Sequence, residues 1–148
     1  MIGSLKKIFG TDDPPVTRML ETREPREIAT AALLLELARS DFSESAQEVD
    51  AIRHLLQRRF GLQDTALDEL IKNATRRADT SLSLHEFTHR LNRELPEEDK
   101  LEIVEMLWRV SHADGRIDKH EEHLIRRIAG LLHITDSERV RMKLKVVM

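Results

Sequence analysis

Residues 108–129 read WRVSHADGRIDKHEEHLIRRIA, and residues 35–56 read LELARSDFSESAQEVDAIRHLL. The two stretches align without a gap, each residue lying 73 positions from its counterpart. Matching acidic and apolar residues fix this register: Asp41 with Asp114, Glu48 with Glu121, Ile52 with Ile125, Leu37 with Val110, and Leu55 with Ile128. A helix, an acidic turn and a second helix at a constant offset predict an internal duplication. Chance matching of amphipathic helices is the competing explanation.

The composition favours helices over strands. Apolar residues make up 40% of the 148 residues, whereas Phe, Trp and Tyr together make up 3%, so the core must consist of Leu, Ile, Val and Ala. Strands favour aromatic and β-branched residues, and Leu and Ala are strong helix formers. A chain of this length is expected to form one all-α domain with its own core.

The charge balance and the absence of cysteine narrow the possible functions. Lys plus Arg (24) and Asp plus Glu (27) are interspersed and leave a net charge of -3, which does not suggest a nucleic-acid-binding protein. Without cysteine, a disulfide framework, a thiolate zinc site and a thiol nucleophile are excluded, and a reducing compartment is favoured. No apolar run reaches the length of a transmembrane segment or a signal peptide. We therefore expect a cytoplasmic protein.

Local signals predict seven helices and no strand. The run GTDDPP over residues 10–15 interrupts regular structure, so we expect an N-terminal arm over 1–15 and the domain over 16–148. Apolar residues at helical spacing predict a first helix over 24–40. Four pairs place a capping residue three positions before a glutamate: Ser45 with Glu48, Ser83 with Glu86, Asp118 with Glu121, and Thr135 with Glu138. Two further helices are predicted over 64–78 and 96–111.

Residues 113–121 read ADGRIDKHE, which carries the signature A-D-G-x-[IL]-D-x-x-E. With its upstream counterpart and the preceding Trp108, this stretch resembles the TerB-like tellurite-resistance family. The resemblance extends over about residues 24–145. It implies an all-helical bundle of two pseudo-repeats, over about 24–62 and 96–134. It also implies links to metal or oxyanion stress and to complexes near the inner membrane surface, without enzymatic activity. Phe42 and Glu44 stand where the signature has glycine and isoleucine, so the first acidic turn departs from it.

The acidic turn has two interpretations. Counted as a calcium loop that ends at Glu121, it would have Val110 and His112 at its first and third positions, which leaves too few oxygen ligands. In the structural interpretation, Gly115 adopts a left-handed conformation, Asp118 caps a helix and Glu121 closes the capping box. In the other, the two turns face each other and form a site for Mg²⁺, Ca²⁺ or Mn²⁺. The candidate metal ligands are Asp41, Glu48, Asp114, Asp118 and Glu121.

A second motif, HEFTH over residues 85–89, has the H-E-x-x-H pattern of zinc hydrolases. Its spacing puts His85 and His89 on one helical face. Leu84, Phe87 and Leu91 define the apolar stripe of the same helix, however, and this leaves the histidines at the side or in solvent. A zinc-dependent hydrolase that uses His85, Glu86 and His89 is therefore only a remote alternative.

The sequence contains no complete set of catalytic residues. It has no glycine-rich phosphate loop and no serine in a nucleophile motif. We therefore expect a non-enzymatic stress-response domain that acts as a scaffold for a protein partner, one that could belong to a membrane-associated complex. The alternative is a divalent-cation sensor. The terminal run RVRMKLKVVM over residues 139–148 joins basic and apolar residues, as a helix docking on a partner would, although such a run can also pack on its own bundle.

Overall fold

Helix α3 (Pro25–Ala38) lies at the centre of the computed structural model, which describes residues 25–39, 45–79 and 84–148. Ten of its 14 residues are buried. Nine of the ten are apolar and Thr30 is the exception, as expected for a helix that is surrounded by others. Helices α4 to α8 all contact it.

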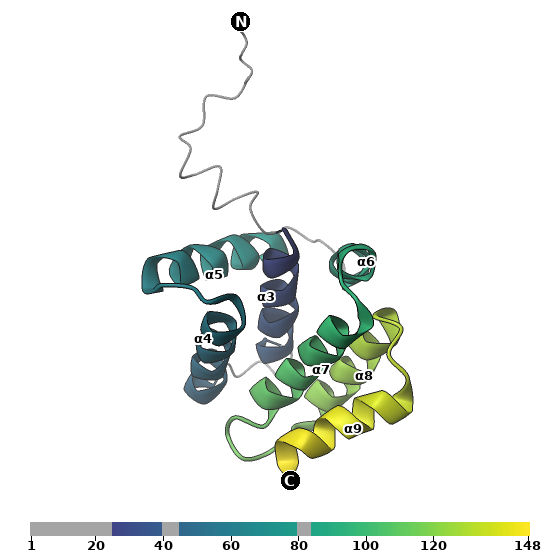
Figure 1. Cartoon of the computed structure of the whole chain (residues 1–148). Helices are drawn as coiled ribbons and strands as arrows, with labels where there is room; N and C mark the ends of the chain where they lie inside the picture. The colour runs from purple at the N-terminus through teal and green to yellow at the C-terminus, as the bar shows by residue number, and fades with distance from the viewer. Residues whose placement is uncertain (1–24, 40–44, 80–83) are drawn as a thin grey trace, which may run out of the picture.

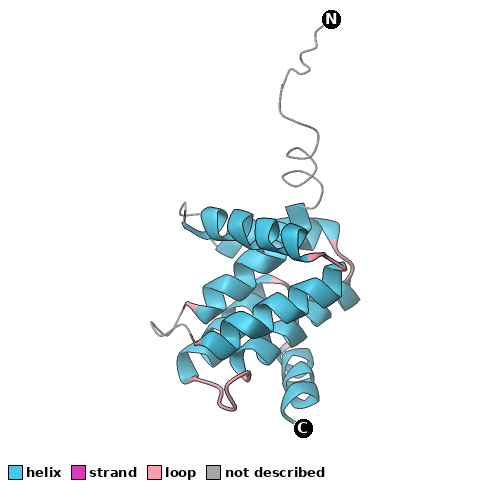
Figure 2. Cartoon of the chain, turned by 90° about the vertical axis from the view of Figure 1, so that its left-hand side faces the viewer, coloured by secondary structure: helices cyan, strands magenta, loops and turns pink. Residues whose placement is uncertain are grey.

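Six further helices complete the described part of the chain: α4 (Ala46–Phe60), α5 (Asp64–Asp79), α6 (Leu84–Glu94), α7 (Glu97–Ser111), α8 (Lys119–Leu131) and α9 (Asp136–Val147). In Figure 1, α4 and α5 lie on one side of α3, and α6, α7 and α8 lie on the other. Helix α9 packs on α7 and α8 at the edge of the bundle. Figure 2 shows helices and loops but no strand in the described residues. The predicted all-α fold is confirmed.

Several helix ends follow from local chemistry. Ser45 Oγ accepts a hydrogen bond from the backbone N–H of Glu48 at 3.0 Å and caps α4. Thr135 and Glu138 form a complete capping box at the start of α9. Gly61 ends α4 with φ 63°, and its N–H donates to the carbonyl of Gln57; this left-handed conformation strains any other residue. The predicted cap Ser83 and the predicted arm over 1–15 lie outside the described residues.

The last helix, α9, packs mainly on α7 and buries little of its own surface. Met142 is its one buried residue, at 3% exposure. The indole N–H of Trp108 donates to the carbonyl of Arg139 at 3.1 Å, which ties α9 to α7. Lys145 pairs with Glu105 of α7 at 3.1 Å, and Lys143 pairs with Glu122 of α8 at 2.7 Å. Much of α9 therefore remains in contact with solvent.

None of the helices in the described ranges combines the length and the apolar character needed to cross a membrane.

Candidate functional site

The acidic turn between α7 and α8 is built from backbone hydrogen bonds. Gly115 has φ 90°, and its N–H donates to the carbonyl of His112 at 2.9 Å. Asp114 Oδ1 accepts from the N–H of Arg116 at 3.1 Å, so this carboxylate closes a local turn. Asp118 Oδ2 accepts from the N–H of His120 at 2.9 Å and caps α8. As predicted, Gly115 is left-handed and Asp118 is a helix cap.

The capping box predicted for Glu121 was wrong, because Asp118 accepts from the N–H of His120 and not from that of Glu121. Its carboxylate does not close a capping box with Asp118, because it points into the bundle, where Ser111 Oγ donates to Glu121 Oε1 at 3.1 Å. Glu121 and Glu48 are each 1% exposed, although glutamate is seldom buried. Both stand at the third residue of a capped helix, 73 positions apart. Burial of both carboxylates is the observation that agrees best with the predicted duplication.

The predicted cation site is only partly within the described residues. Asp41 lies outside them. Within the described ranges, no three His, Cys, Asp or Glu side chains form a group that could hold a metal ion. The site over Asp41, Glu48, Asp114, Asp118 and Glu121 therefore stays a prediction.

The H-E-x-x-H motif lies on α6. His85 and His89 are exposed, while Phe87 and Leu91 of the same helix are buried in the core. Thr88 of the same helix is buried and donates its hydroxyl to the carbonyl of Leu84 at 2.8 Å. The motif therefore lies on the outside of the bundle, as the apolar stripe indicated.

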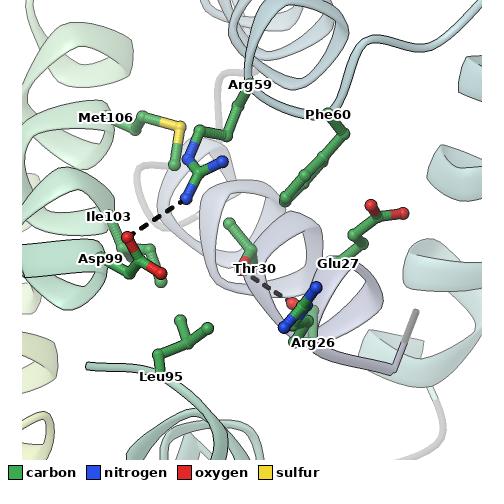
Figure 3. A pocket seen from close by; sticks show the side chains of 9 residues that line it. All are labelled: Arg26, Glu27, Thr30, Arg59, Phe60, Leu95, Asp99, Ile103 and Met106. Carbon is green, nitrogen blue, oxygen red and sulfur yellow. Dashed lines mark hydrogen bonds and ion pairs between the residues drawn. The ribbon is translucent and has the colours of Figure 1, made fainter.

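A cavity of about 380 Å³ opens where α3, α4 and α7 meet. Figure 3 shows Arg59 directed toward Asp99, at 3.5 Å. The same guanidinium pairs with Glu102 at 3.0 Å and lies 5.7 Å from the ring centroid of Phe60. Thr30 donates its hydroxyl to the carbonyl of Arg26 at 2.8 Å. The Arg59 charge is thus neutralised within the protein, which leaves this cavity without a net attraction for an anion from that residue.

A second, more open pocket of about 540 Å³ lies between α8 and α9, and we call it the α8–α9 groove. Half of its lining residues are cations: Lys119 and Arg126 from α8, and Arg139 and Lys143 from α9. The others are Glu122 and His123 from α8, Val140 from α9 and Trp108 from α7. Trp108 is only 1% exposed, and Lys143 Nζ lies 5.3 Å from its ring centroid. This distance fits a cation–π contact that fixes the lysine over the indole.

An apolar ridge borders the α8–α9 groove. Val140, Leu144 and Val147 recur at helical spacing along α9 and are 42%, 47% and 38% exposed. Val140 belongs to both features, because it also lines the groove. Side by side, the ridge and the groove make one surface that is apolar along one edge and cationic along the other.

The basic and apolar run at the C-terminus is evident in the sequence, but the contribution of α8 to this surface was not predicted. A signal for it was present, because Lys119, His123 and Arg126 recur at spacings of four and three and therefore share one helical face. Which face α9 approaches depends on tertiary packing, and helical spacing alone does not give that.

Comparisons with known proteins agree with this all-helical architecture. The family model described as "Tellurite resistance protein TerB" matches residues 27–144. No curated protein and no solved structure matches the chain. Since the family model extends over most of the chain, this protein belongs to the tellurite-resistance TerB family.

Proposed function

We propose that this domain is a non-enzymatic scaffold that binds a protein partner through α9 and the adjacent face of α8. The observation that carries the proposal is the exposed ridge of Val140, Leu144 and Val147 beside the α8–α9 groove. Three aliphatic side chains in line on one helix are a feature of docking surfaces, whereas single exposed apolar residues are ordinary. The core does not need these side chains, because Met142 anchors the opposite face of the helix.

The ridge can supply part of a binding energy. Burying the exposed remainder of each side chain yields about 1–2 kcal/mol. Three such side chains contribute less than the roughly 8 kcal/mol that corresponds to a micromolar complex. A partner therefore also needs polar contacts, and the groove next to the ridge offers them.

The proposed cellular role follows the family. The family name refers to tellurite resistance, and we assign this chain to the same kind of oxyanion stress response, in the cytoplasm. The lack of enzymatic activity is part of the proposal. It rests on a sequence without a thiol, a phosphate loop or a nucleophile motif.

Site-specific photo-crosslinking tests the proposal. A photo-reactive amino acid is placed at Leu144 or at Val140 in cells that express the full chain, and at exposed Arg93 of α6 as a control. We expect a discrete protein adduct from the two ridge positions and none from position 93. The partner is then identified and purified for a binding measurement.

The purified partner decides between docking and incidental contact. We expect Leu144→Asp to weaken its binding by about tenfold or more, because a carboxylate on the ridge would have to be desolvated. Thermal melting of the variant should match that of the wild-type protein, since Leu144 is largely exposed. Equal affinity for both proteins would refute the proposed function.

A further inference from the structure

We infer that the partner presents an acidic amphipathic helix, whose apolar residues pack on the ridge and whose carboxylates enter the α8–α9 groove. This inference rests on the proposed function and specifies the chemistry of the partner. It goes beyond that function because an apolar ridge alone would not select for charge.

The charges in the groove support an acidic ligand. Lys143 is paired with Glu122, and Arg139 is paired with Asp136. Lys119 and Arg126 line the same groove, and neither is ion-paired to another described residue. Two positive charges are thus uncompensated in a chain whose net charge is -3. Their location in one groove is a local feature and does not reflect an excess of basic residues.

Other cations of the bundle either are ion-paired or, like exposed Arg58 and Arg93, lie outside the α8–α9 groove. Arg53 pairs with Asp68 at 2.9 Å, and Arg59 pairs with Glu102 at 3.0 Å. Those cations are neutralised within the bundle, so a ligand would have to compete with an existing carboxylate. At Lys119 and Arg126, an incoming carboxylate gains charge-assisted hydrogen bonds without such competition.

The shape of the surface favours a helix as the binding element. Val140, Leu144 and Val147 lie one helical turn apart, so a second helix beside α9 can pack its own side chains between them. The cations lie to one side of the ridge, on α8. A partner helix with glutamates flanking its apolar stripe would meet both features at once.

An anionic membrane is the main competing occupant. Basic and apolar side chains on one helix also suit a lipid surface. The α8–α9 groove, however, lies between two helices, with Trp108 and the paired Lys143 among its lining residues. A pocket of about 540 Å³ admits individual side chains, whereas a bilayer presents a broad surface that would contact the ridge and leave the pocket unfilled.

Trp108 provides the measurement, because it is the one tryptophan of the chain. Its indole N–H gives a single signal in a nitrogen-15 correlation spectrum. The full chain is titrated with a synthetic peptide in which leucines recur at spacings of three and four and glutamates flank them. A matched peptide has glutamine in place of every glutamate. Vesicles of phosphatidylglycerol and phosphatidylcholine form the third titration.

We expect the glutamate peptide to shift the Trp108 signal and to bind about tenfold or more tightly than the glutamine peptide. Added salt should weaken this binding, since the contacting charges are exposed to solvent. The double variant Lys119→Glu with Arg126→Glu should lose about tenfold or more in affinity. The control Arg58→Glu with Arg93→Glu makes the same change in net charge at exposed positions of α4 and α6 and should stay within about twofold.

The outcomes separate the two proposals. Equal affinity for the two peptides, or equal losses in the two double variants, would overturn the acidic-helix inference while a partner crosslinked at Leu144 kept the scaffold proposal. Binding of the vesicles without binding of the glutamate peptide would overturn the inference in favour of a lipid surface. If the peptide binds but no crosslinked adduct forms at the ridge in cells, the groove still prefers acidic groups. This outcome would count against the scaffold proposal.

Discussion

Helices α4 and α8 occupy matching positions in the predicted register of the two halves, yet their outer faces differ. Each begins at a capping residue in extended conformation and buries a glutamate three positions later. On α4, Arg53 and Arg59 are paired with acidic residues of other helices. On α8, Lys119 and Arg126 are not paired within the described residues and line the α8–α9 groove.

This difference distinguishes residues that build the fold from residues that we propose contact a partner. The buried glutamates appear in both halves, so we interpret them as part of the scaffold. Arg58 of α4 is also without an ion pair in the described residues, but Lys119 and Arg126 of α8 line a groove beside the apolar ridge of α9. The shared buried glutamates agree with the predicted duplication, which stays a prediction.

The largest expected effect on stability tests whether the buried faces of α4 and α8 are equivalent. Ile52 and Ile125 are 1% and 0% exposed, and replacing either with alanine should lower the free energy of unfolding by about 2–5 kcal/mol, because each change leaves a cavity. Urea denaturation measures both. Val49→Ala, at a more exposed position of α4, is the control and should stay within about 0.5 kcal/mol. A large loss for Ile125 with none for Ile52 would break the comparison.

The buried carboxylate of the second half should give the next largest effect. Glu121→Ala removes the acceptor for Ser111 and should cost about 1.5–3 kcal/mol. Glu121→Gln should cost less, since the amide oxygen can still accept from the hydroxyl. Chemical denaturation of the chelated protein provides the measurement. If Glu121→Gln instead stabilised the metal-free protein, the carboxylate would be under charge repulsion, as expected for a ligand without its cation.

Removing either of two helix caps should lower the stability by a similar, smaller amount. Ser45→Ala and Asp118→Ala each remove a side-chain acceptor at a helix start, and each should cost about 1 kcal/mol. Amide hydrogen exchange should show the loss of protection in the first turn of α4 or α8, respectively. Unchanged exchange in the Asp118→Ala variant would mean that the cap does not stabilise α8.

Much of this fold could be predicted from the sequence because the helix starts depend on neighbouring residues. Ser45, Asp118 and Thr135 are the N-cap residues of three helices, as the local patterns indicated, and α7 begins one residue after the predicted start at 96. Glu121 was mispredicted because the same letters that form a capping box can also place a carboxylate in the core, and packing around Ser111 decides between the two. The groove could not be predicted, because it depends on the approach of α9 to α8.

The attachment of α9 to the second half should weaken in acid. Burial raises the pKa of Glu105, but hydrogen bonds from Arg109 and Lys145 outweigh it, and the net pKa lies below the ordinary 4.5. A carboxyl group with a lowered pKa stabilises the fold above its unfolded pKa, and this stabilisation is lost as the pH falls through the folded value. We therefore expect Glu105→Gln to cost up to about 1 kcal/mol at neutral pH.

Below pH 4.5 the difference between the variant and the wild-type protein should shrink toward zero. Denaturation curves across this range measure it. A difference that is constant with pH would mean that Glu105 acts through packing and that its ion pairs contribute nothing.

The smallest expected effect concerns Asp114 and the predicted cation site. Asp114→Asn keeps an oxygen that can accept from Arg116 and should change the stability by less than about 0.5 kcal/mol. Thermal melting of the chelated protein with added Mg²⁺, Ca²⁺ or Mn²⁺ tests the site, because a ligand of the native state raises Tm. A rise in the wild-type protein that disappears in Asp114→Asn would assign the acidic turn a metal-binding role. A rise that persists would exclude Asp114 as a ligand.

The central position of α3 has a consequence for how the chain reaches its fold. This helix, with its nine apolar core residues, emerges early during synthesis, while α7 and α8, which cover part of it, begin at residues 97 and 119. Its neighbours run from α4 to α8, so no shorter stretch of the chain covers α3 completely. Helices α3 to α8 should therefore fold in one cooperative step. If translation stalls before α8 is made, α3 exposes apolar side chains that are prone to aggregate. Chaperones bind such segments until the rest of the chain has been synthesised.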